Sequence, residues 1–130
     1  MYKRQVYDGV EFLNDKIYLM GGRNFTDAIN YNIFERYSSG SDTWETLESM
    51  STARGGVAAA SYANKLYAIG GRNSSNTYLS TVEIFDPLLD NWSSGPSLPT
   101  PLAYASAING DNVLYIVGGC LLYTSPSPRD

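Results

Sequence analysis

The chain has 130 residues, of which 43% are hydrophobic and 13% aromatic, so it is long enough for roughly one domain and too apolar to be disordered. Its formal net charge is −4 and its basic residues form no stripe that could neutralise a phosphate backbone, so we expect no nucleic-acid partner. The first residues include two basic side chains with no apolar run behind them, and no apolar run reaches about 18 residues, so we expect neither a secretory signal nor a membrane partner. A single cysteine cannot close an internal disulfide, and we expect a cytoplasmic location.

Short β-prone segments, each bounded by turn residues, follow one another along the chain. "KIYLM" and "KLYAI" are apolar runs stopped by a glycine pair, and they are too short for helices. "TVEIFDP" alternates as a half-buried strand does before Asp86 and Pro87 turn the chain. "GGVAAA" is a strand of small residues, which suits a crowded axis. The predicted strands are residues 6–12, 16–20, 32–37, 44–47, 55–62, 65–69, 80–85 and 92–94, with two more from about residue 102.

These segments recur with a fixed period. Pairs of glycines recur after 49 and then 48 residues, and the two tryptophans are 48 residues apart. Between the glycines and the tryptophan of each unit, an acid, an aromatic residue and an aspartate also match. Several landmarks in one order at one period indicate a repeat architecture, in which each unit is one group of strands that packs on its neighbours.

With these landmarks the chain resembles the kelch repeat family over residues 6–119, and its "VEIFDP" and "GGRN" segments are most similar to the kelch modules of BTB-kelch adaptors. The resemblance implies an all-β fold. We expect a kelch-type β-propeller fragment with two complete four-stranded blades and half of a third, the first strand of each blade lining a central channel. The kelch region is expected over residues 1–119, with units at about 6–54, 55–101 and an incomplete 102–119.

The recurring glycines and aromatic residues have two interpretations each. Glycine-rich loops cradle phosphates where a helix follows, but no helix is predicted here, so we expect the pairs to let a strand end turn tightly beside a neighbouring blade. A tryptophan can be a platform for a sugar or a base, but one tryptophan per unit favours a wedge between blades. The predicted structural positions are Gly21, Gly22, Tyr37, Trp44, Gly70, Gly71, Phe85, Trp92, Gly118 and Gly119.

The sequence offers little for catalysis. It has no histidine, which excludes Ser-His-Asp triads and imidazole-based zinc or copper sites within this segment. Cys120 has no evident base beside it, and Asp42 and Asp90 occupy equivalent turn positions rather than those of an acid–base pair. We therefore predict no catalytic residue, no metal and no cofactor. The alternative is a fragment of a propeller enzyme, an oxidase or a sugar epimerase, whose catalytic residues lie outside this segment.

The resemblance to kelch modules of ubiquitin-ligase adaptors also implies a ligand face. In those modules the residues after the glycine pair and just before the innermost strand project onto that face. At the matching positions, the predicted partner-binding residues are Tyr7, Arg23, Asn24, Arg54, Arg72, Asn73 and Tyr104. The face is uneven, because Gly56 stands where the neighbouring units have tyrosine and Leu102 stands where Arg54 does.

Arginine and tyrosine suit such a face, because the guanidinium fork clamps carboxylates and tyrosine adds rigid contact area. We therefore expect a protein or peptide ligand with an acidic or polar segment. The alternative is that Arg23 and Arg72 are simply solvated loop residues. The predicted function is protein–protein recognition by a non-catalytic adaptor or scaffold, linked to a ubiquitin ligase or to actin.

The last segment, "CLLYTSPSPRD", breaks the repeat where a polar loop and another "VEIF"-like strand are due. It resembles a translated sequencing adapter, so residues 120–130 are predicted to be a non-native tail. The alternative is a genuine disordered C-terminus.

Overall fold

The computed structural model describes residues 5–6, 9–24 and 29–120. Every regular element in this part is a β-strand. It therefore has no helix long and apolar enough to span a membrane. The strands are β1 (Gln5–Val6), β2 (Gly9–Leu13), β3 (Lys16–Met20), β4 (Arg23–Asn24), β5 (Ile29–Asn30), β6 (Phe34–Ser38), β7 (Thr43–Thr46), β8 (Ala58–Tyr62), β9 (Lys65–Ile69), β10 (Val82–Asp86), β11 (Asn91–Ser94), β12 (Ala103–Gly110) and β13 (Val113–Cys120).

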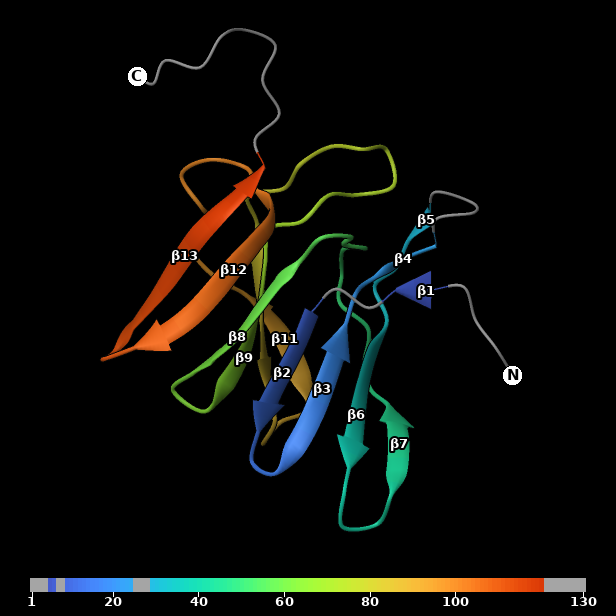
Figure 1. Cartoon of the computed structure of the whole chain (residues 1–130). Helices are drawn as coiled ribbons and strands as arrows, with labels where there is room; N and C mark the ends of the chain where they lie inside the picture. Colours follow the sequence, from blue (N-terminus) through green and yellow to red (C-terminus); the bar gives the residue numbers. More distant parts are fainter. Residues whose placement is uncertain (1–4, 7–8, 25–28, 121–130) are drawn as a thin grey trace, which may run out of the picture.

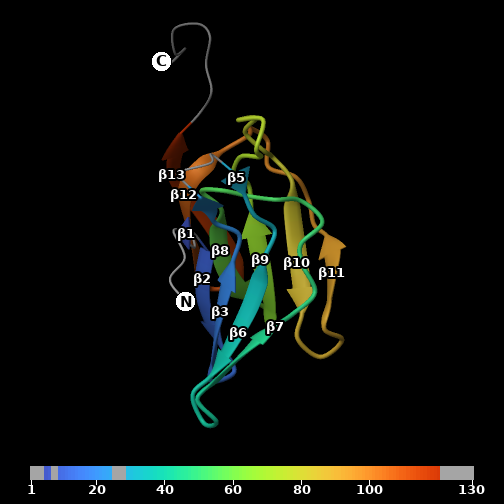
Figure 2. The ribbon, with the colours of Figure 1, turned by 90° about the vertical axis from the view of Figure 1, so that its right-hand side faces the viewer.

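Three larger sheets lie side by side (Figure 1). The first sheet has the order β2-β3-β6-β7, the second β8-β9-β10-β11 and the third β12-β13, all antiparallel. The inner strands β2, β8 and β12 contact one another in turn, and the other strands fan out from them (Figures 1 and 2). The architecture is therefore all-β, with two complete four-stranded blades and the inner pair of a third, as the repeat predicted.

Each of the ten predicted blade strands is present, but four of them begin two or three residues later than expected, and the two inner strands show the larger difference. The segments predicted to start at residues 6 and 55 begin as blade strands at Gly9 and Ala58. The reason is that the preceding backbone pairs elsewhere: Val6 pairs with Arg23, and Gly55 bridges to Arg72. Gly55 lies in the connection between the first two blades, and Val6 lies in a separate sheet beside the first blade.

A small sheet was not predicted. No strand was expected between residues 20 and 32, yet β4 and β5 form an antiparallel pair there, and β1 joins the other edge of β4. Only two residues of each strand pair, which is too short for an alternating pattern to be visible in the sequence. The small sheet continues from the end of β3 and sits at the upper end of the first sheet in Figure 1.

The main core fills the space between the first and second sheets. Phe34 stands at its centre, with ring centroids 4.6 Å from Phe85 and 4.8 Å from Trp92. Tyr18 stacks on Phe34 at 5.6 Å and also lies 6.3 Å from the Phe85 ring. The Trp92 indole donates a hydrogen bond to the Glu48 carbonyl at 2.8 Å, so this side chain joins the two sheets by packing and by a polar contact.

The glycine pairs lie where each blade meets the connection to the next. Gly22 N donates to Arg54 O at 3.0 Å, and Gly71 N donates to Leu102 O at 2.8 Å. The glycine before each of them has a positive φ, and a Cβ there would collide with the same carbonyl oxygen. The pairs thus combine left-handed backbone with a close approach that a side chain would block.

Candidate interaction site at the glycine end of the sheets

Residues predicted to bind a partner gather at the end of the sheets where the glycine pairs lie. Arg23 Nη1 donates to Asn30 Oδ1 at 3.0 Å, and Asn30 Nδ2 donates to the Arg72 carbonyl at 2.9 Å. The Arg72 guanidinium lies over the Tyr104 ring, 5.5 Å from its centroid. We call Arg23, Asn30, Gly56, Arg72 and Tyr104 the rim cluster. It joins the small sheet, the second sheet and the third.

Tyr104 covers the position that Gly56 leaves open. A Cβ at Gly56 would stand 2.7 Å from Tyr104 Cε1, so the ring of one unit lies across the glycine of the unit before it. Tyr104 N also donates to Gly56 O at 2.8 Å. The gap that Gly56 leaves in the predicted face is therefore partly filled, because the Tyr104 ring of the next unit lies over it.

Tyr104 has a left-handed backbone, with φ at 62°, like the matching Gly56 at 65°. A bulky residue in this region is strained, and such residues persist where the surroundings hold them in place. Its side chain nevertheless remains 47% exposed. The strained backbone thus presents an aromatic surface at the rim instead of burying it.

Asn30 is the rim residue that sequence reasoning missed. Its side chain is only 3% exposed, and its amide links Arg23 to the Arg72 backbone. Its own N–H donates to Ser74 Oγ at 3.1 Å. The sequence signal was only an asparagine inside a polar stretch, which is typical of any loop.

Both asparagines that were predicted to bind beside the arginines make contacts within the fold. Asn73 Oδ1 accepts hydrogen bonds from Ser75 N at 3.0 Å and Thr77 N at 2.9 Å, so this side chain shapes its own loop. Asn24 pairs with Gln5 across the small sheet. Tyr7, the remaining rim prediction, lies outside the described residues.

The structure corrects the prediction for Arg54. Its side chain is 0% exposed and therefore cannot contact a partner. Arg54 Nη2 and Nε donate to Glu83 Oε2 at 2.9 and 3.1 Å, and Nη1 donates to the carbonyls of Gly70 and Thr81 at 2.6 and 3.0 Å. The residue lies between the rim and the interior, where a carboxylate on β10 attracts it inward.

The Arg54–Glu83 pair joins the connection between the first two blades to the second blade. Burial lowers the pKa of Arg54, and the hydrogen bond and charge of Glu83 oppose that effect. Ser51 N and Oγ donate to Glu83 Oε1 at 2.8 and 2.9 Å, so both carboxylate oxygens are occupied. A buried ion pair with these hydrogen bonds is costly to break from one side.

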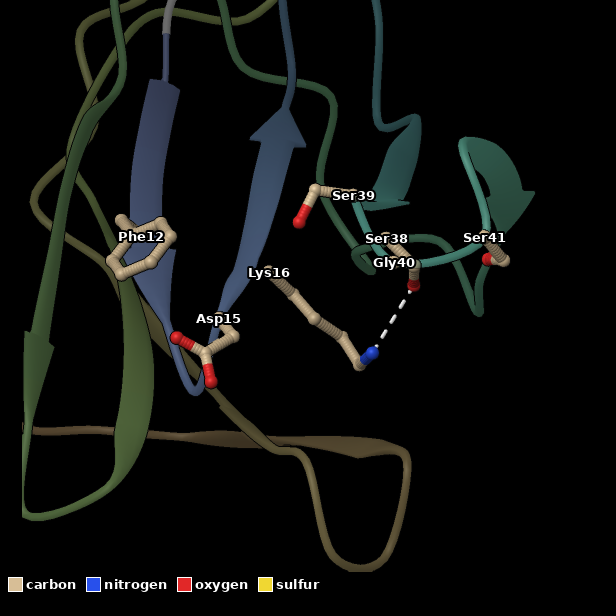
Figure 3. A pocket seen from close by; sticks show the side chains of 7 residues that line it. All are labelled: Phe12, Asp15, Lys16, Ser38, Ser39, Gly40 and Ser41. Atoms are coloured by element: carbon tan, nitrogen blue, oxygen red, sulfur yellow. Dashed lines mark hydrogen bonds between the residues drawn. The ribbon is translucent and has the colours of Figure 1, made fainter.

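A hollow lies at the opposite end of the first sheet (Figure 3). It has a volume of about 520 Å³ and is lined by Phe12, Asp15, Lys16 and the turn of residues 38–41. Lys16 Nζ donates to Ser38 Oγ at 3.1 Å across it. The hollow is open and polar. Its Lys16 lies at the start of β3, whereas Arg23 follows the end of that strand, so the hollow and the rim cluster lie at opposite ends of the sheet.

The part of the chain that the structure describes contains no group of three or more side chains able to ligate a metal ion. Its acidic groups with lowered pKa are held by cations on the neighbouring strand: Arg36 of β6 holds the Glu45 carboxyl, and Lys65 of β9 holds the Asp86 carboxyl. These are ion pairs between neighbouring strands, not a converging set of acids.

Comparison with known proteins agrees with the fold. A family model described as the Kelch motif matches residues 9–51 and 53–99, which contain the first two large sheets. A solved structure titled "Structure of YjhT" superposes with a TM-score of 0.76 at 16% identity, covering 89% of this chain and 44% of that one. At this identity the likeness shows the fold alone.

Three curated relatives extend the match to sequence. Human Kelch-like protein 33 is 35% identical over 81% of this chain and 20% of its own length. Beta-scruin of Limulus polyphemus is 27% identical over 92% of this chain and 14% of its own length. Kelch repeat protein M-T8 of Myxoma virus is 29% identical over 82% of this chain and 20% of its own length. The chain spans a fifth or less of these relatives, and it belongs to the kelch repeat family.

Proposed function

We propose that this chain is part of a non-catalytic kelch module that recognises a protein partner, and that the rim cluster binds an acidic or polar peptide segment of it. The observation that carries the proposal is the placement of Arg72 against Tyr104. The two residues are far apart in the sequence and come from different units, yet the guanidinium lies over a half-exposed ring at one end of the sheets.

The chemistry of Arg72 favours an anionic ligand group. Among the described residues, no carboxylate lies within ion-pair distance of it, and its Nε is buried without a hydrogen-bond acceptor. A buried donor of this kind is rare in proteins. A ligand carboxylate would bring charge compensation to the guanidinium, while Tyr104 offers the apolar part of the peptide a rigid surface.

The negative net charge of the chain does not oppose this proposal. Charges separated by more than about 8 Å are largely screened at physiological salt, so an acidic segment responds mainly to the nearest side chains. At the rim these are Arg72 and, through Asn30, Arg23.

The wider role is that of an adaptor or scaffold, with a ubiquitin ligase or actin as the linked system and the cytoplasm as the location. The support is membership in the kelch family and the names of kelch-like relatives. Companion domains and further blades belong to the proposal, because the matched relatives are about five to seven times longer than the aligned region.

The test is binding of a fluorescein-labelled decapeptide of alternating glutamate and glycine, with the lysine–glycine peptide as its charge-reversed control. We expect the acidic peptide alone to bind, and Arg72→Ala to weaken binding by about tenfold or more. Arg36→Ala is the matched control, because it removes the same charge from an outer strand where Glu45 already holds the guanidinium. Equal weakening by both variants, or unchanged binding in Arg72→Ala, would overturn the proposal.

A further inference from the structure

The same cross-strand position holds different side chains in the first two sheets. In the second sheet, Lys65 Nζ donates to Asp86 Oδ2 at 2.8 Å and forms an ion pair. In the first sheet, Lys16 Nζ donates to Ser38 Oγ at 3.1 Å. Each lysine begins the second strand of its blade, and Asp86 and Ser38 each end the third. The first sheet therefore has a neutral hydroxyl where the second has a carboxylate.

Lys16 lacks the anionic partner that Lys65 has. Among the described residues, no carboxylate lies within ion-pair distance of Lys16. Glu45 on β7 is already held by Arg36 at 3.1 Å. Asp15 lines the same hollow, but Figure 3 shows its carboxylate pointing away from the Lys16 ammonium. The ammonium thus donates to a neutral oxygen although its charge suits an anion.

Ser38 lies beside open space. It is half-buried and lines the hollow of about 520 Å³ at this end of the first sheet (Figure 3). The four-residue turn that follows it, residues 39–42, is exposed throughout, and so are the four residues of β7. Ser38 forms the last pair between β6 and β7, so opening the turn end of this hairpin uncovers little apolar surface. The hydroxyl is therefore within reach of an enzyme and has room for a larger group.

This exposure does not depend on which units border the described blades. The twin turn of the second sheet, residues 87–90, belongs to a blade that packs against the first sheet, yet three of its four residues are exposed. The Asp86 side chain before it also keeps 20% of its surface exposed. A further blade packed in the same way on the first sheet would leave the turn after Ser38 open.

We propose that Ser38 is a phosphorylation site whose phosphate pairs with Lys16, as Asp86 pairs with Lys65. A protein kinase transfers the γ-phosphoryl group of a nucleoside triphosphate to the serine. The bond from Ser38 Oγ to phosphorus forms, the bond from phosphorus to the β-phosphate oxygen breaks, and the hydroxyl proton goes to the base of the kinase. Nucleoside diphosphate leaves. The site is independent of the rim cluster and so of the proposed function.

The phosphate changes both the sheet and the hollow. It brings nearly two negative charges and three acceptor oxygens to a lysine that already contacts the serine. A charge-assisted hydrogen bond then joins β3 to β6, as the ion pair joins β9 to β10 in the second sheet. Because one ammonium does not neutralise the phosphate, the hollow also becomes anionic. Phosphorylation therefore acts as a reversible charge switch at the end of the sheet opposite the rim cluster.

The first experiment asks whether the site is used. The full chain is incubated with ATP and an animal cell extract, and the phosphorylated residues are located by mass spectrometry. We expect phosphate on Ser38, and we expect Ser38→Ala to lose most of the phosphate incorporated into the hairpin. Ser41→Ala is the matched control from the same turn and should keep it. Phosphate only on Ser39 or Ser41, or none on the hairpin, would overturn the proposal.

The second experiment tests the pairing with Lys16. Phosphoserine is incorporated at position 38 during translation, and urea unfolding is measured with Lys16 intact and in Lys16→Met, which keeps an apolar side chain without the charge. We expect phosphoserine to raise the urea midpoint by about 0.3 M, and Lys16→Met to remove that gain. Phosphoserine at position 41 is the control, because Ser41 Oγ contacts Thr43 Oγ1 and not a lysine.

Three results of the second experiment would contradict the pairing. These are an equal gain from phosphoserine at position 41, a gain that persists in Lys16→Met, and no gain at position 38. A chain that fails to fold with phosphoserine at position 38 would also overturn the proposal, because the phosphate and Lys16 meet only across the folded sheet.

Discussion

The first and second sheets carry equivalent residues on one face, which we call the front face. The two front faces differ in what packs against them. By register, Tyr37 and Trp44 of the first sheet correspond to Phe85 and Trp92 of the second. Phe85 is 0% exposed because the second sheet packs against the first, whereas Trp44 is 54% exposed and contacts Tyr37 at 5.0 Å. Similar residues in equivalent strands thus have different burial, because burial here belongs to the pair of blades and not to the single blade.

The polar positions show the same difference. Glu83 is 6% exposed and bound by Arg54 and Ser51, while the matching Glu35 is half-buried. Stability in repeat proteins is approximately a sum of unit and interface contributions. We therefore expect a residue on the second sheet's front face to matter more than its twin on the first, and the following predictions test this expectation pair by pair.

The largest effect is expected for the aromatic pair. Phe85→Ala should lower the free energy of unfolding by about 3–5 kcal/mol, because it leaves a cavity beside Phe34 and Trp92. Tyr37→Ala should cost less than about 1 kcal/mol, because its ring is only half-buried. Urea unfolding of both variants measures the difference. Equal losses would show that the two faces contribute alike.

The acidic pair should show the next largest difference. Glu83→Gln removes the charge that compensates the fully buried Arg54, and we expect a loss of about 2–3 kcal/mol. Glu35→Gln, on the less buried face, should cost less than about 1 kcal/mol. Equilibrium unfolding at neutral pH measures both. A loss for Glu35→Gln as large as for Glu83→Gln would contradict the expectation.

Much of the fold was visible in the sequence, because strands bounded by turns and a period of 48 or 49 residues are local features. The front-face difference was not, since it depends on which neighbour each blade meets. Arg54 shows why the site was harder: an arginine beside a glycine pair indicates a surface loop, and only the fold brings Glu83 within 2.9 Å of it. Tyr104 and Arg72 were predicted singly, but their contact across two units was not.

The glycine pairs offer a comparison between the second and third sheets. Gly70 and Gly118 both have positive φ, at 64° and 76°. A Cβ at Gly70 would collide with the Leu102 carbonyl oxygen, whereas a Cβ at Gly118 meets no described atom within 4 Å. Gly118→Ala should therefore cost only the left-handed strain, about 1–2 kcal/mol. Gly70→Ala should cost at least about 1 kcal/mol more, since the backbone must also shift. Thermal unfolding of the two variants gives the difference. Equal losses would show that the Leu102 backbone moves away from the added Cβ without loss of stability.

The smallest effect should appear in acid. Lys65 Nζ donates to Asp86 Oδ2 at 2.8 Å, and this hydrogen bond, helped by the Leu88 N–H, holds the pKa of Asp86 below its usual value. A carboxyl whose pKa is lower in the folded state stabilises the fold above its unfolded pKa, and that stabilisation is lost as the pH falls through the folded value. In the first sheet, Lys16 meets Ser38 at the equivalent place, so this lysine–carboxylate contact is absent from that position. Asp86→Ser should therefore flatten the decline of stability below about pH 4. Ser38→Asp should steepen it, because it builds the same pair on the first sheet. Parallel pH profiles for the wild type and both variants would show that the lysine–aspartate contact is too well screened by solvent to distinguish the two blades.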